Sequence, residues 1–378
     1  MKIFMFPGQG SQTVGMGGDL FDRYPEYTAQ ADEVLGYSIK TLCLADPQKQ
    51  LNFTQFTQPA LYVVNALNYF DKVAQGIKAD YLIGHSLGEF NALMAAQSFS
   101  FEDGLKLVKK RGELMSQAKE GGMAAIINAS KEKIETILKD NQLSNIDLAN
   151  FNTPSQIVIS GKKEEIIQAQ NCFSEDKMLY IPLNTSGAFH SRFMAEAKDE
   201  FAEYLKPFNI QPPITKVISN VTAKTYGDDV ATSLAAQIAS AVRWSETIEY
   251  LIGLGDAEFI EVGHGDVLTK MILKIKRETT VKPGSVSAEP TELVTDSSTT
   301  DDAVGSIFAK QFSQVHEKVE QWNKVYPVGT KVKSTWVDAT NLQTRTEAVV
   351  LFGHRAAVYM KDYNGYFDLD ELIPQQSL

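Results

Sequence analysis

The serine at position 86 lies in the sequence Gly84-His85-Ser86-Leu87-Gly88, a GxSxG pattern. Between a strand and a helix, this pattern holds a serine hydroxyl on a tight turn, where the glycines let the backbone pass closely. Residues 80–84 favour a short strand and residues 87–97 favour a helix. The start of that helix would direct N–H groups toward negative charge developing near the serine. We therefore predict that Ser86 is a nucleophile, rather than an ordinary residue of a strand-to-helix turn.

A serine hydroxyl needs a base to become a good nucleophile, and the chain has five histidines. His85 belongs to the turn itself, so its side chain should point away from that of Ser86. His316 and His354 belong to the C-terminal tail. His190 lies in a loop predicted between a strand and a helix, where functional side chains are commonly displayed. The spacing alone leaves both a catalytic and a structural role open for His190.

Arg111 lies on the apolar face of the helix predicted over residues 101–117. It follows Leu107 and Val108 by four and three positions and precedes Met115 by four, so it shares their face. An inward-facing guanidinium is costly unless a carboxylate or carbonyl oxygen accepts its hydrogen bonds. Its partner is either a residue of this chain, in an internal ion pair, or a carboxylate on a substrate.

The elements that must position these residues alternate between strands and helices, which is typical of an α/β fold. Strands are predicted at 2–6, 80–84, 123–128, 156–160, 179–183 and 257–261. Helices are predicted at 87–97, 101–117, 131–140, 194–206, 233–240 and 244–254. We expect residues 1–120 and 196–280 to form the core domain, with a small α+β subdomain, residues 121–195, inserted into it.

The composition changes after Arg277. Residues 281–304 are rich in Thr, Ser, Pro and acidic residues without an apolar period, which indicates a linker. Residues 305–323 could form a helix, and short β-rich runs separated by turn signals follow from 326 to 374. We predict that residues 305–378 form a helix and a small β-barrel of the SH3 type.

Charge and composition exclude several classes of protein. The net charge of −11 argues against nucleic acid or an anionic membrane surface as the partner. The two cysteines, Cys43 and Cys172, are too far apart to suggest a disulfide framework or a thiolate metal site, and no metal is expected. No apolar run approaches the roughly 18–20 residues that span a bilayer. The chain enters a Gly-rich loop after its first few residues, too early for a signal peptide, so we predict a cytoplasmic protein.

Nine short motifs follow one another in order over about residues 1–277. They are FPGQGSQ (6–12), TQPA (57–60), GHSLGE (84–89), KRGELM (110–115), NFNTPSQIVISG (150–161), GAFHS (187–191), SNVTA (219–223), VRW (242–244) and EVGHGDVLT (261–269). Together they resemble the malonyl-CoA:acyl-carrier-protein transacylase family, which includes the acyltransferases of polyketide synthases. The resemblance implies an α/β-hydrolase-like large domain and a ferredoxin-like subdomain at 121–195.

The resemblance also implies roles for individual residues. Ser86 would be the nucleophile and His190 the base, with the imidazole oriented by the backbone carbonyl of Gln237. Backbone N–H groups of Gln9 and Leu87 would bind the oxyanion. Substrate binding is implied for Arg111, Met115, Phe189 and Gln58. Arg111 would hold the malonyl carboxylate, and the bulky ring of Phe189 resembles that of malonyl-specific members.

The implied reaction moves a malonyl group from malonyl-CoA to Ser86 and then to the phosphopantetheine thiol of an acyl carrier protein, without a permanently bound cofactor. The chain departs from the family at His264, where proline is usual, and in its tail, 281–378, which suggests a module for docking to a polyketide synthase. Two alternatives stay open. One is an acyl hydrolase that releases stalled chains from carrier proteins, and Arg111 argues against it. The other is a non-enzymatic scaffold protein, in which Ser86, His190, Arg111 and Gln9 would have no catalytic role.

Overall fold

The structure is a computed structural model that describes residues 1–118, 120–173, 177–185, 187–280, 317–334, 342–351, 355–361 and 366–374. The chain divides into two units, residues 1–281 and 282–378. The linker predicted at 281–304 lies outside the described residues, as do residues 305–316 of the predicted tail helix.

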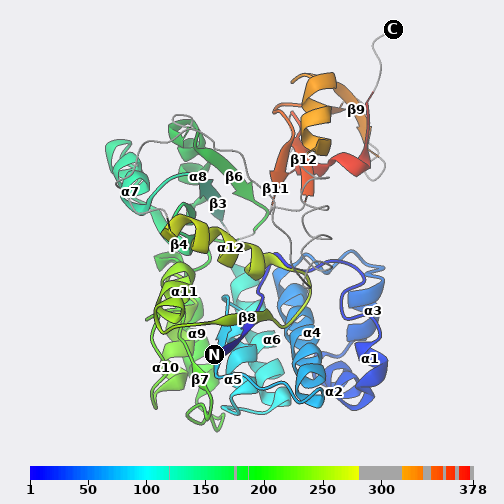
Figure 1. Ribbon diagram of the computed structural model, residues 1–378, viewed down its shortest axis with the longest axis vertical. Coiled ribbons are helices and arrows are strands. Elements are labelled where there is room, and N and C mark those ends of the chain that lie inside the picture. Colours follow the sequence, from blue (N-terminus) through cyan, green and yellow to red (C-terminus); the bar gives the residue numbers. More distant parts are fainter. Residues whose placement is uncertain are drawn as a thin grey trace, which may run out of the picture. The chain divides into compact units, whose positions relative to one another are not determined.

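A four-stranded parallel sheet forms the centre of the first unit (Figure 1). Its order is β7-β2-β1-β8, with β1 at Lys2–Phe6, β2 at Tyr81–Gly84, β7 at Lys216–Val217 and β8 at Glu258–Glu261. Ile3 to Phe6 are all buried, as expected for a parallel strand covered on both faces. Phe6 pairs with Gly84, so the loops that follow β1 and β2 leave the sheet side by side. The sheet therefore brings the first Gly-rich loop to the GxSxG turn.

The described part of this unit contains twelve α-helices. They are α1 (Leu20–Arg23), α2 (Pro25–Leu35), α3 (Ile39–Leu44), α4 (Thr54–Ala74), α5 (Gly88–Ala95), α6 (Phe101–Gln117), α9 (Ala195–Leu205), α10 (Val230–Gln237), α11 (Trp244–Gly253) and α12 (Val267–Thr280), apart from the two in the inserted subdomain. The predicted helix 101–117 is α6, begun by Ser100, whose hydroxyl accepts a hydrogen bond from the Asp103 N–H at 3.0 Å. Helices α1, α2, α3, α4 and α12 were not predicted. Every residue of α4 from Thr57 to Leu67 is buried, so this helix has no amphipathic period to reveal it.

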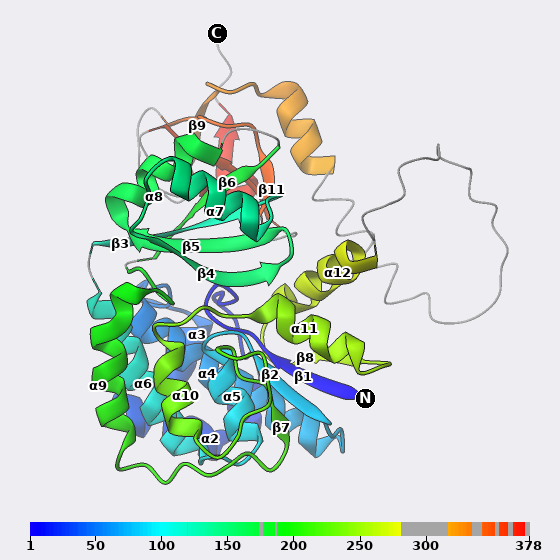
Figure 2. The same ribbon diagram turned by 90° about the vertical axis from the view of Figure 1, so that its left-hand side faces the viewer.

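The inserted subdomain follows the order strand, helix, strand, strand, helix, strand. Its elements are β3 (Gly121–Ile127), α7 (Lys131–Asp140), β4 (Ile146–Thr153), β5 (Gln156–Lys162), α8 (Lys163–Ala169) and β6 (Leu179–Leu183). The strands form an antiparallel sheet in the order β4-β5-β3-β6, and α7 and α8 pack on one face of it (Figure 2). Strand β4 was missed because two register shifts and several polar residues interrupt its alternation. A bridge from Asn150 to Val242 joins the subdomain to the rest of the unit.

The second unit is β-rich after a helix at 317–325. Two three-stranded antiparallel sheets follow, in the orders β10-β9-β14 and β11-β12-β13. The strands are β9 (Lys331–Ser334), β10 (Leu342–Gln343), β11 (Val349–Leu351), β12 (Arg355–Tyr359), β13 (Tyr366–Asp368) and β14 (Leu372–Pro374). Val319 and Trp322 from the helix pack with Val332 and Val358 from the strands, so this unit has an apolar core of its own.

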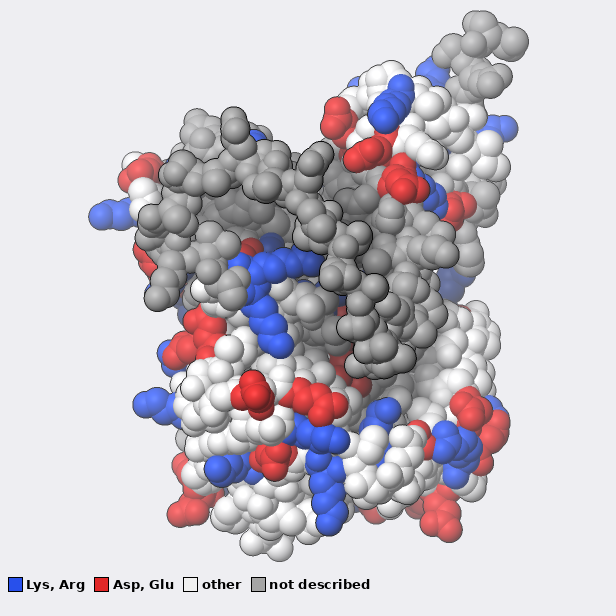
Figure 3. Space-filling model, in the orientation of Figure 1, with Lys and Arg blue, Asp and Glu red and all other residues white. Residues whose placement is uncertain are grey.

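The whole is an α/β fold with one parallel sheet and several antiparallel ones. Basic and acidic side chains are interspersed over the described surface shown in Figure 3, so on that face neither sign of charge marks out a partner. None of the helices within the described ranges is long and apolar enough to cross a membrane.

Candidate active site

The turn that carries Ser86 depends on the two glycines that flank it. A Cβ added at Gly84 would lie 1.9 Å from the Gly88 carbonyl carbon, and one added at Gly88 would lie 2.0 Å from the Phe6 carbonyl oxygen. Ser86 itself has a φ of 52°, in the left-handed region that non-glycine residues rarely occupy. Such strain persists only where the surroundings hold it, and it is common at functional sites. The turn projects the Ser86 hydroxyl away from β2 at the start of α5.

The Ser86 hydroxyl meets a histidine that is 104 residues away in the sequence. Its Oγ lies 2.7 Å from His190 Nε2. The other ring nitrogen, Nδ1, lies 3.0 Å from the Gln237 carbonyl oxygen and 3.1 Å from that of Ser240. Because both of these neighbours can only accept, Nδ1 carries the proton and Nε2 is left as the acceptor for the Ser86 proton. The geometry is that of a nucleophile with an oriented base.

Burial, and secondly the positive charge of Arg111, lower the pKa of His190 from 6.5 to about 3. The imidazole is therefore neutral at physiological pH, as a general base must be before it accepts a proton. His190 is 5% exposed, so the pair is shielded from solvent on the side of the ring.

Arg111 lies beside Ser86 and is 1% exposed. Its Nη1 donates to Gln58 Oε1 at 2.7 Å, and its Nη2 donates to Gln237 Oε1 at 2.8 Å and to Ser86 Oγ at 3.1 Å. The guanidinium lies 5.5 Å from the centre of the Phe90 ring, and its Nε is buried without an acceptor. Within the described residues, no carboxylate comes within 4 Å of it, so the internal ion pair considered above is not formed. Burial lowers the pKa of Arg111 to about 10, which leaves it a cation at neutral pH.

A buried carboxylate stands behind Arg111, separated from it by an amide. Glu89 is fully buried, and its Oε1 accepts from the Asn220 backbone N–H at 3.0 Å and from the Tyr226 hydroxyl at 2.6 Å. Its Oε2 accepts from the Gln237 amide nitrogen, and the oxygen of the same amide accepts from Arg111. Burial raises the pKa of Glu89 from 4.5 to about 7, against the lowering effect of these donors.

Asn220 joins this network to the turn. Its side-chain oxygen accepts from the Ser86 backbone N–H at 2.7 Å, and its side-chain nitrogen donates to the Gly84 carbonyl at 2.7 Å. Sequence reasoning assigned no role to Asn220, Glu89, Ser240 or the side chain of Gln237. Glu89 could have been noticed as the lone charge in the otherwise apolar helix LGEFNALMAA, but nothing local to the other three marks them.

The loop after β1 reaches the turn because residue 8 is glycine. A Cβ at Gly8 would lie 2.3 Å from the His85 carbonyl oxygen and 3.6 Å from the Leu87 nitrogen. The next residue, Gln9, is thereby held at the turn. The N–H groups of Gln9 and Leu87 find no backbone acceptor among the described residues, so both are free to donate to an anion near Ser86.

The remaining residues predicted to bind substrate are Gln58, Met115 and Phe189. Gln58 accepts from Arg111, and its amide nitrogen lies 3.3 Å from Met115 Sδ, so Met115 supports Gln58. Phe189 is buried beside Gly187, where an added Cβ would lie 2.9 Å from its ring. The structure thus brings Gln58 into a hydrogen bond with Arg111, and Met115 against Gln58.

Two other histidines have separate partners. His85 Nε2 lies 2.8 Å from Asn152 Oδ1 and its ring packs on Trp244, which agrees with a side chain directed away from Ser86. His264 Nε2 lies 2.6 Å from Thr13 Oγ1 and ties the loop after β8 to the loop after β1. Neither ring is hydrogen-bonded to Ser86 or Arg111.

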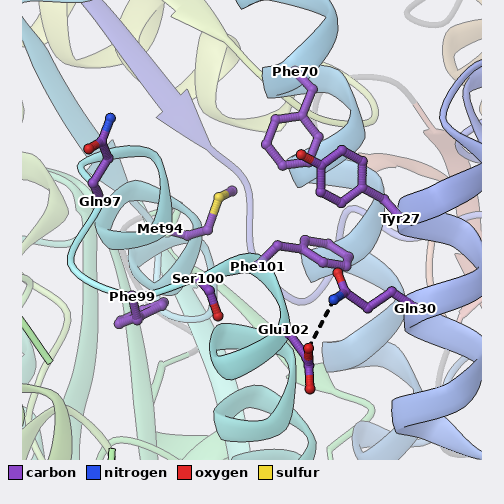
Figure 4. A pocket seen from close by; sticks show the side chains of 9 residues that line it. All are labelled: Tyr27, Gln30, Phe70, Met94, Gln97, Phe99, Ser100, Phe101 and Glu102. Carbon is purple, nitrogen blue, oxygen red and sulfur yellow. Dashed lines mark hydrogen bonds between the residues drawn. The ribbon is translucent and has the colours of Figure 1, made fainter. Parts of the chain in front are cut away.

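A cavity of about 470 Å³ opens elsewhere on this unit, between α2, α4 and the segment that joins α5 to α6 (Figure 4). The rings of Tyr27, Phe70 and Phe101 line it, and Gln30 donates to Glu102 across it at 2.9 Å. None of the predicted site residues lines this cavity, so it is not the site of the Ser86 chemistry. In the described parts of the chain, His, Cys, Asp and Glu side chains do not gather in threes as a metal site would require.

Comparison with known proteins identifies relatives that cover the first unit. The model of the acyl transferase domain matches residues 3–300. The polyketide biosynthesis malonyl CoA-acyl carrier protein transacylase PksC of Bacillus subtilis is 53% identical over 287 residues, which are 75% of this chain and 100% of that protein.

Solved structures agree with this comparison. In the crystal structure of malonyl CoA-acyl carrier protein transacylase from Burkholderia pseudomallei, the sequence is 55% identical to this one and the TM-score is 0.73. The match covers 75% of this chain and 99% of that chain. A malonyl transacylase solved in complex with its type II polyketide synthase acyl carrier protein is 33% identical in sequence, with a TM-score of 0.69. The match covers 73% of this chain and 93% of that chain. The family model ends at residue 300, before the described part of the second unit.

Proposed function

The chain belongs to the acyl transferase domain family, and from this premise we propose that it transfers malonyl groups from malonyl-CoA to the phosphopantetheine thiol of an acyl carrier protein. The nine motifs indicated the same family, and that prediction is confirmed. The observation that carries the substrate assignment is Arg111, a buried cation that no carboxylate of the described residues pairs with. Its Nη2 lies 3.1 Å from Ser86 Oγ.

In the first half-reaction, Ser86 Oγ attacks the thioester carbonyl of malonyl-CoA while its proton passes to His190 Nε2. A C–O bond forms, the C–S bond breaks, and His190 returns the proton to the coenzyme A thiolate as it leaves. The N–H groups of Gln9 and Leu87 stabilise the oxyanion, and donors of this kind are worth about a hundred- to a thousandfold in rate. The carbonyls of Gln237 and Ser240 hold the imidazolium that forms between the two proton transfers.

In the second half-reaction, the phosphopantetheine thiol gives its proton to His190 and attacks the malonyl-serine ester. The C–O bond to Ser86 breaks and the serine oxygen recovers the proton. Arg111 pairs with the malonyl carboxylate in both halves, using the donors that the protein leaves unused. Gln58 and Gln237 hold the plane of the guanidinium, and Phe189 limits the space beside the acyl group.

The hydrolase alternative is not favoured. The relatives are transacylases, and a hydrolase that releases uncharged acyl chains has no use for a cation next to its nucleophile. A non-enzymatic scaffold would not need Ser86 and His190 at 2.7 Å with an oriented imidazole.

The finer description of the fold belongs to the same proposal. We take the first unit as an α/β-hydrolase-like core with a ferredoxin-like subdomain, supported by the parallel sheet and by the β4-β5-β3-β6 order. We take the second unit as an SH3-like module that docks this cytoplasmic enzyme to a polyketide synthase. Its support is the pair of small antiparallel sheets, together with the similarity to a polyketide biosynthesis transacylase.

The intact mass of the protein after brief mixing with malonyl-CoA tests the function directly. We expect a malonyl adduct on the wild type, none on Ser86→Ala, and its disappearance when holo acyl carrier protein is added and becomes malonylated. An adduct that forms on Ser86→Ala would place the nucleophile elsewhere. Release of malonate at the same rate with and without the carrier would replace the transferase with a hydrolase.

A further inference from the structure

The carboxylate of Glu89 has no part in the reaction as described, yet it lies directly behind the Arg111 site, on the far side of the Gln237 amide. It is fully buried in the first turn of α5, three positions after the nucleophile. Three donors from outside α5 converge on it: the Asn220 N–H, the Tyr226 hydroxyl and the Gln237 amide. These donors favour the ionised form of the carboxyl group, whereas burial disfavours it and raises the pKa of Glu89 to about 7. Above neutral pH, Glu89 therefore brings a buried negative charge to the site.

The charge of Glu89 is balanced by Arg111 through the amide of Gln237. One end of that amide donates to Glu89 and the other accepts from Arg111 at 2.8 Å. In the free enzyme above neutral pH, this buried cluster therefore contains one cation and one anion and is neutral overall. The malonyl carboxylate would add a second anion to the same cation. A net charge in a buried site is costly, and when carboxylates share a site one of them takes up a proton.

The surroundings of Glu89 allow it to hold that proton. Its Oε1 lies 2.6 Å from the Tyr226 oxygen, which can accept a hydrogen bond as well as donate one. The Ser219 side chain is a neighbour of the Tyr226 hydroxyl and lowers the pKa of that hydroxyl, against the larger raising effect of burial and Glu89. When Glu89 is protonated, the Tyr226 hydroxyl can turn toward Ser219 and accept from the carboxyl group, while the other two donors keep their acceptors.

We infer that Glu89 is the resident counter-ion of Arg111 and takes up one proton when the malonyl carboxylate joins that guanidinium, which couples binding of a charged acyl group to pH. This inference rests on the proposed function. It makes Glu89 a positioning residue for specificity, since an uncharged acyl group brings no second anion and demands no proton.

The groups that could compete for this role are few. Among the described residues, the charged and titratable side chains that act on Glu89 are Arg111 from α6 and Tyr226 from the turn after β7; Gln237 from α10 and the Asn220 N–H are neutral donors. The pKa of about 7 in the unliganded protein means that Glu89 is ionised above neutrality and can gain a proton there.

The test is calorimetric titration of full-length Ser86→Ala, which cannot be acylated at residue 86, with malonyl-CoA at pH 6, 7 and 8 in buffers of different ionisation enthalpy. We expect proton uptake that rises toward one per site at pH 8, because free Glu89 is already protonated at pH 6. Affinity for malonyl-CoA should then weaken by up to about tenfold per pH unit above pH 7. Acetyl-CoA is the matched control ligand and should bind without proton uptake.

The variant Glu89→Gln, made in the same background, keeps the size of the side chain and cannot titrate. It should bind malonyl-CoA without proton uptake. In enzymes with Ser86 intact, the ratio of kcat/KM for malonyl-CoA to that for acetyl-CoA should fall with rising pH in the wild type and stay flat in Glu89→Gln. Because titration of His190 affects both substrates alike, it cancels in this ratio. The pH dependence of the ratio in the wild type can be measured even if the variant is unstable.

Equal proton uptake with malonyl-CoA and acetyl-CoA, or none with either, would overturn the inference. So would an unchanged pH profile in a folded Glu89→Gln protein. These outcomes are distinct from failure of the proposed function, in which the wild type would form no malonyl adduct at all.

Discussion

Replacing Arg111 by alanine should convert a malonyl-selective enzyme into one that prefers uncharged acyl groups. The guanidinium has five N–H bonds. Three of them are engaged by Gln58, Gln237 and Ser86, which leaves two, including the unpartnered Nε–H, for a ligand. Two hydrogen bonds to a carboxylate are together worth about 3–4 kcal/mol. The variant should therefore lose about a hundred- to a thousandfold in kcat/KM for malonyl-CoA.

The assay compares kcat/KM for malonyl-CoA and acetyl-CoA, with transfer to holo acyl carrier protein read by intact mass. Transfer from acetyl-CoA should be retained or should rise, because acetyl makes no use of the guanidinium. Arg23→Ala is the matched control, since Arg23 pairs with Asp71 in a partly exposed ion pair outside the site. It should leave both activities within about twofold, as expected for a surface pair.

Equal losses for malonyl and acetyl in Arg111→Ala would refute the reasoning, because Arg111 would then support the Ser86 turn in general and not a carboxylate. The thermal midpoint of the variant separates this case from simple unfolding. Arg111→Lys sharpens the comparison, because an ammonium keeps the charge but lacks the planar fork. We expect it to recover only part of the malonyl activity.

Two further predictions concern stability. His190 has a lowered pKa in the folded protein, so its contribution to stability is lost as pH falls below 6.5, whereas Glu89 has a raised pKa, so its contribution is lost as pH rises from 4.5 to about 7. Glu89→Gln removes the second contribution. The unfolding free energy of the variant minus that of the wild type should therefore rise by up to about 1.4 kcal/mol per pH unit between pH 4.5 and 7. A difference, measured by urea unfolding, that stays constant over this pH range would contradict the prediction. Gly84→Ala should abolish the malonyl adduct and destabilise the fold by about 1–3 kcal/mol, since the added Cβ would meet the Gly88 backbone at 1.9 Å. An active and equally stable Gly84→Ala protein in thermal unfolding would show that the turn relaxes freely.

The sequence was sufficient for features that depend on neighbouring residues. The ends of the helix at 131–140 and of the strand at 179–183 were predicted as the structure has them. The placement of Arg111 on the buried face of α6 followed from helical spacing, and the turn at Ser86 followed from its two glycines. Local patterns also misplaced α10, predicted at 233–240 and observed at Val230–Gln237, because its capping residue Asp229 was not recognised.

Features that depend on packing could not be obtained from the residues themselves. Helix α4 is buried along most of its length and so lacks the alternation that marks a surface helix. The choice of His190 over the other histidines came from family resemblance, since its 2.7 Å contact with Ser86 joins two loops 104 residues apart.

The sequence by itself determined a serine on a tight turn, a buried arginine and a family. Only the tertiary structure decided what surrounds them. No carboxylate from the described residues pairs with Arg111, and Gln237 contacts His190 with its backbone and Arg111 with its side chain. It also placed Glu89 behind that amide. The physical reason is that hydrogen bonds and charge balance in a buried site depend on which distant elements pack together, and short-range spacing carries little of that information.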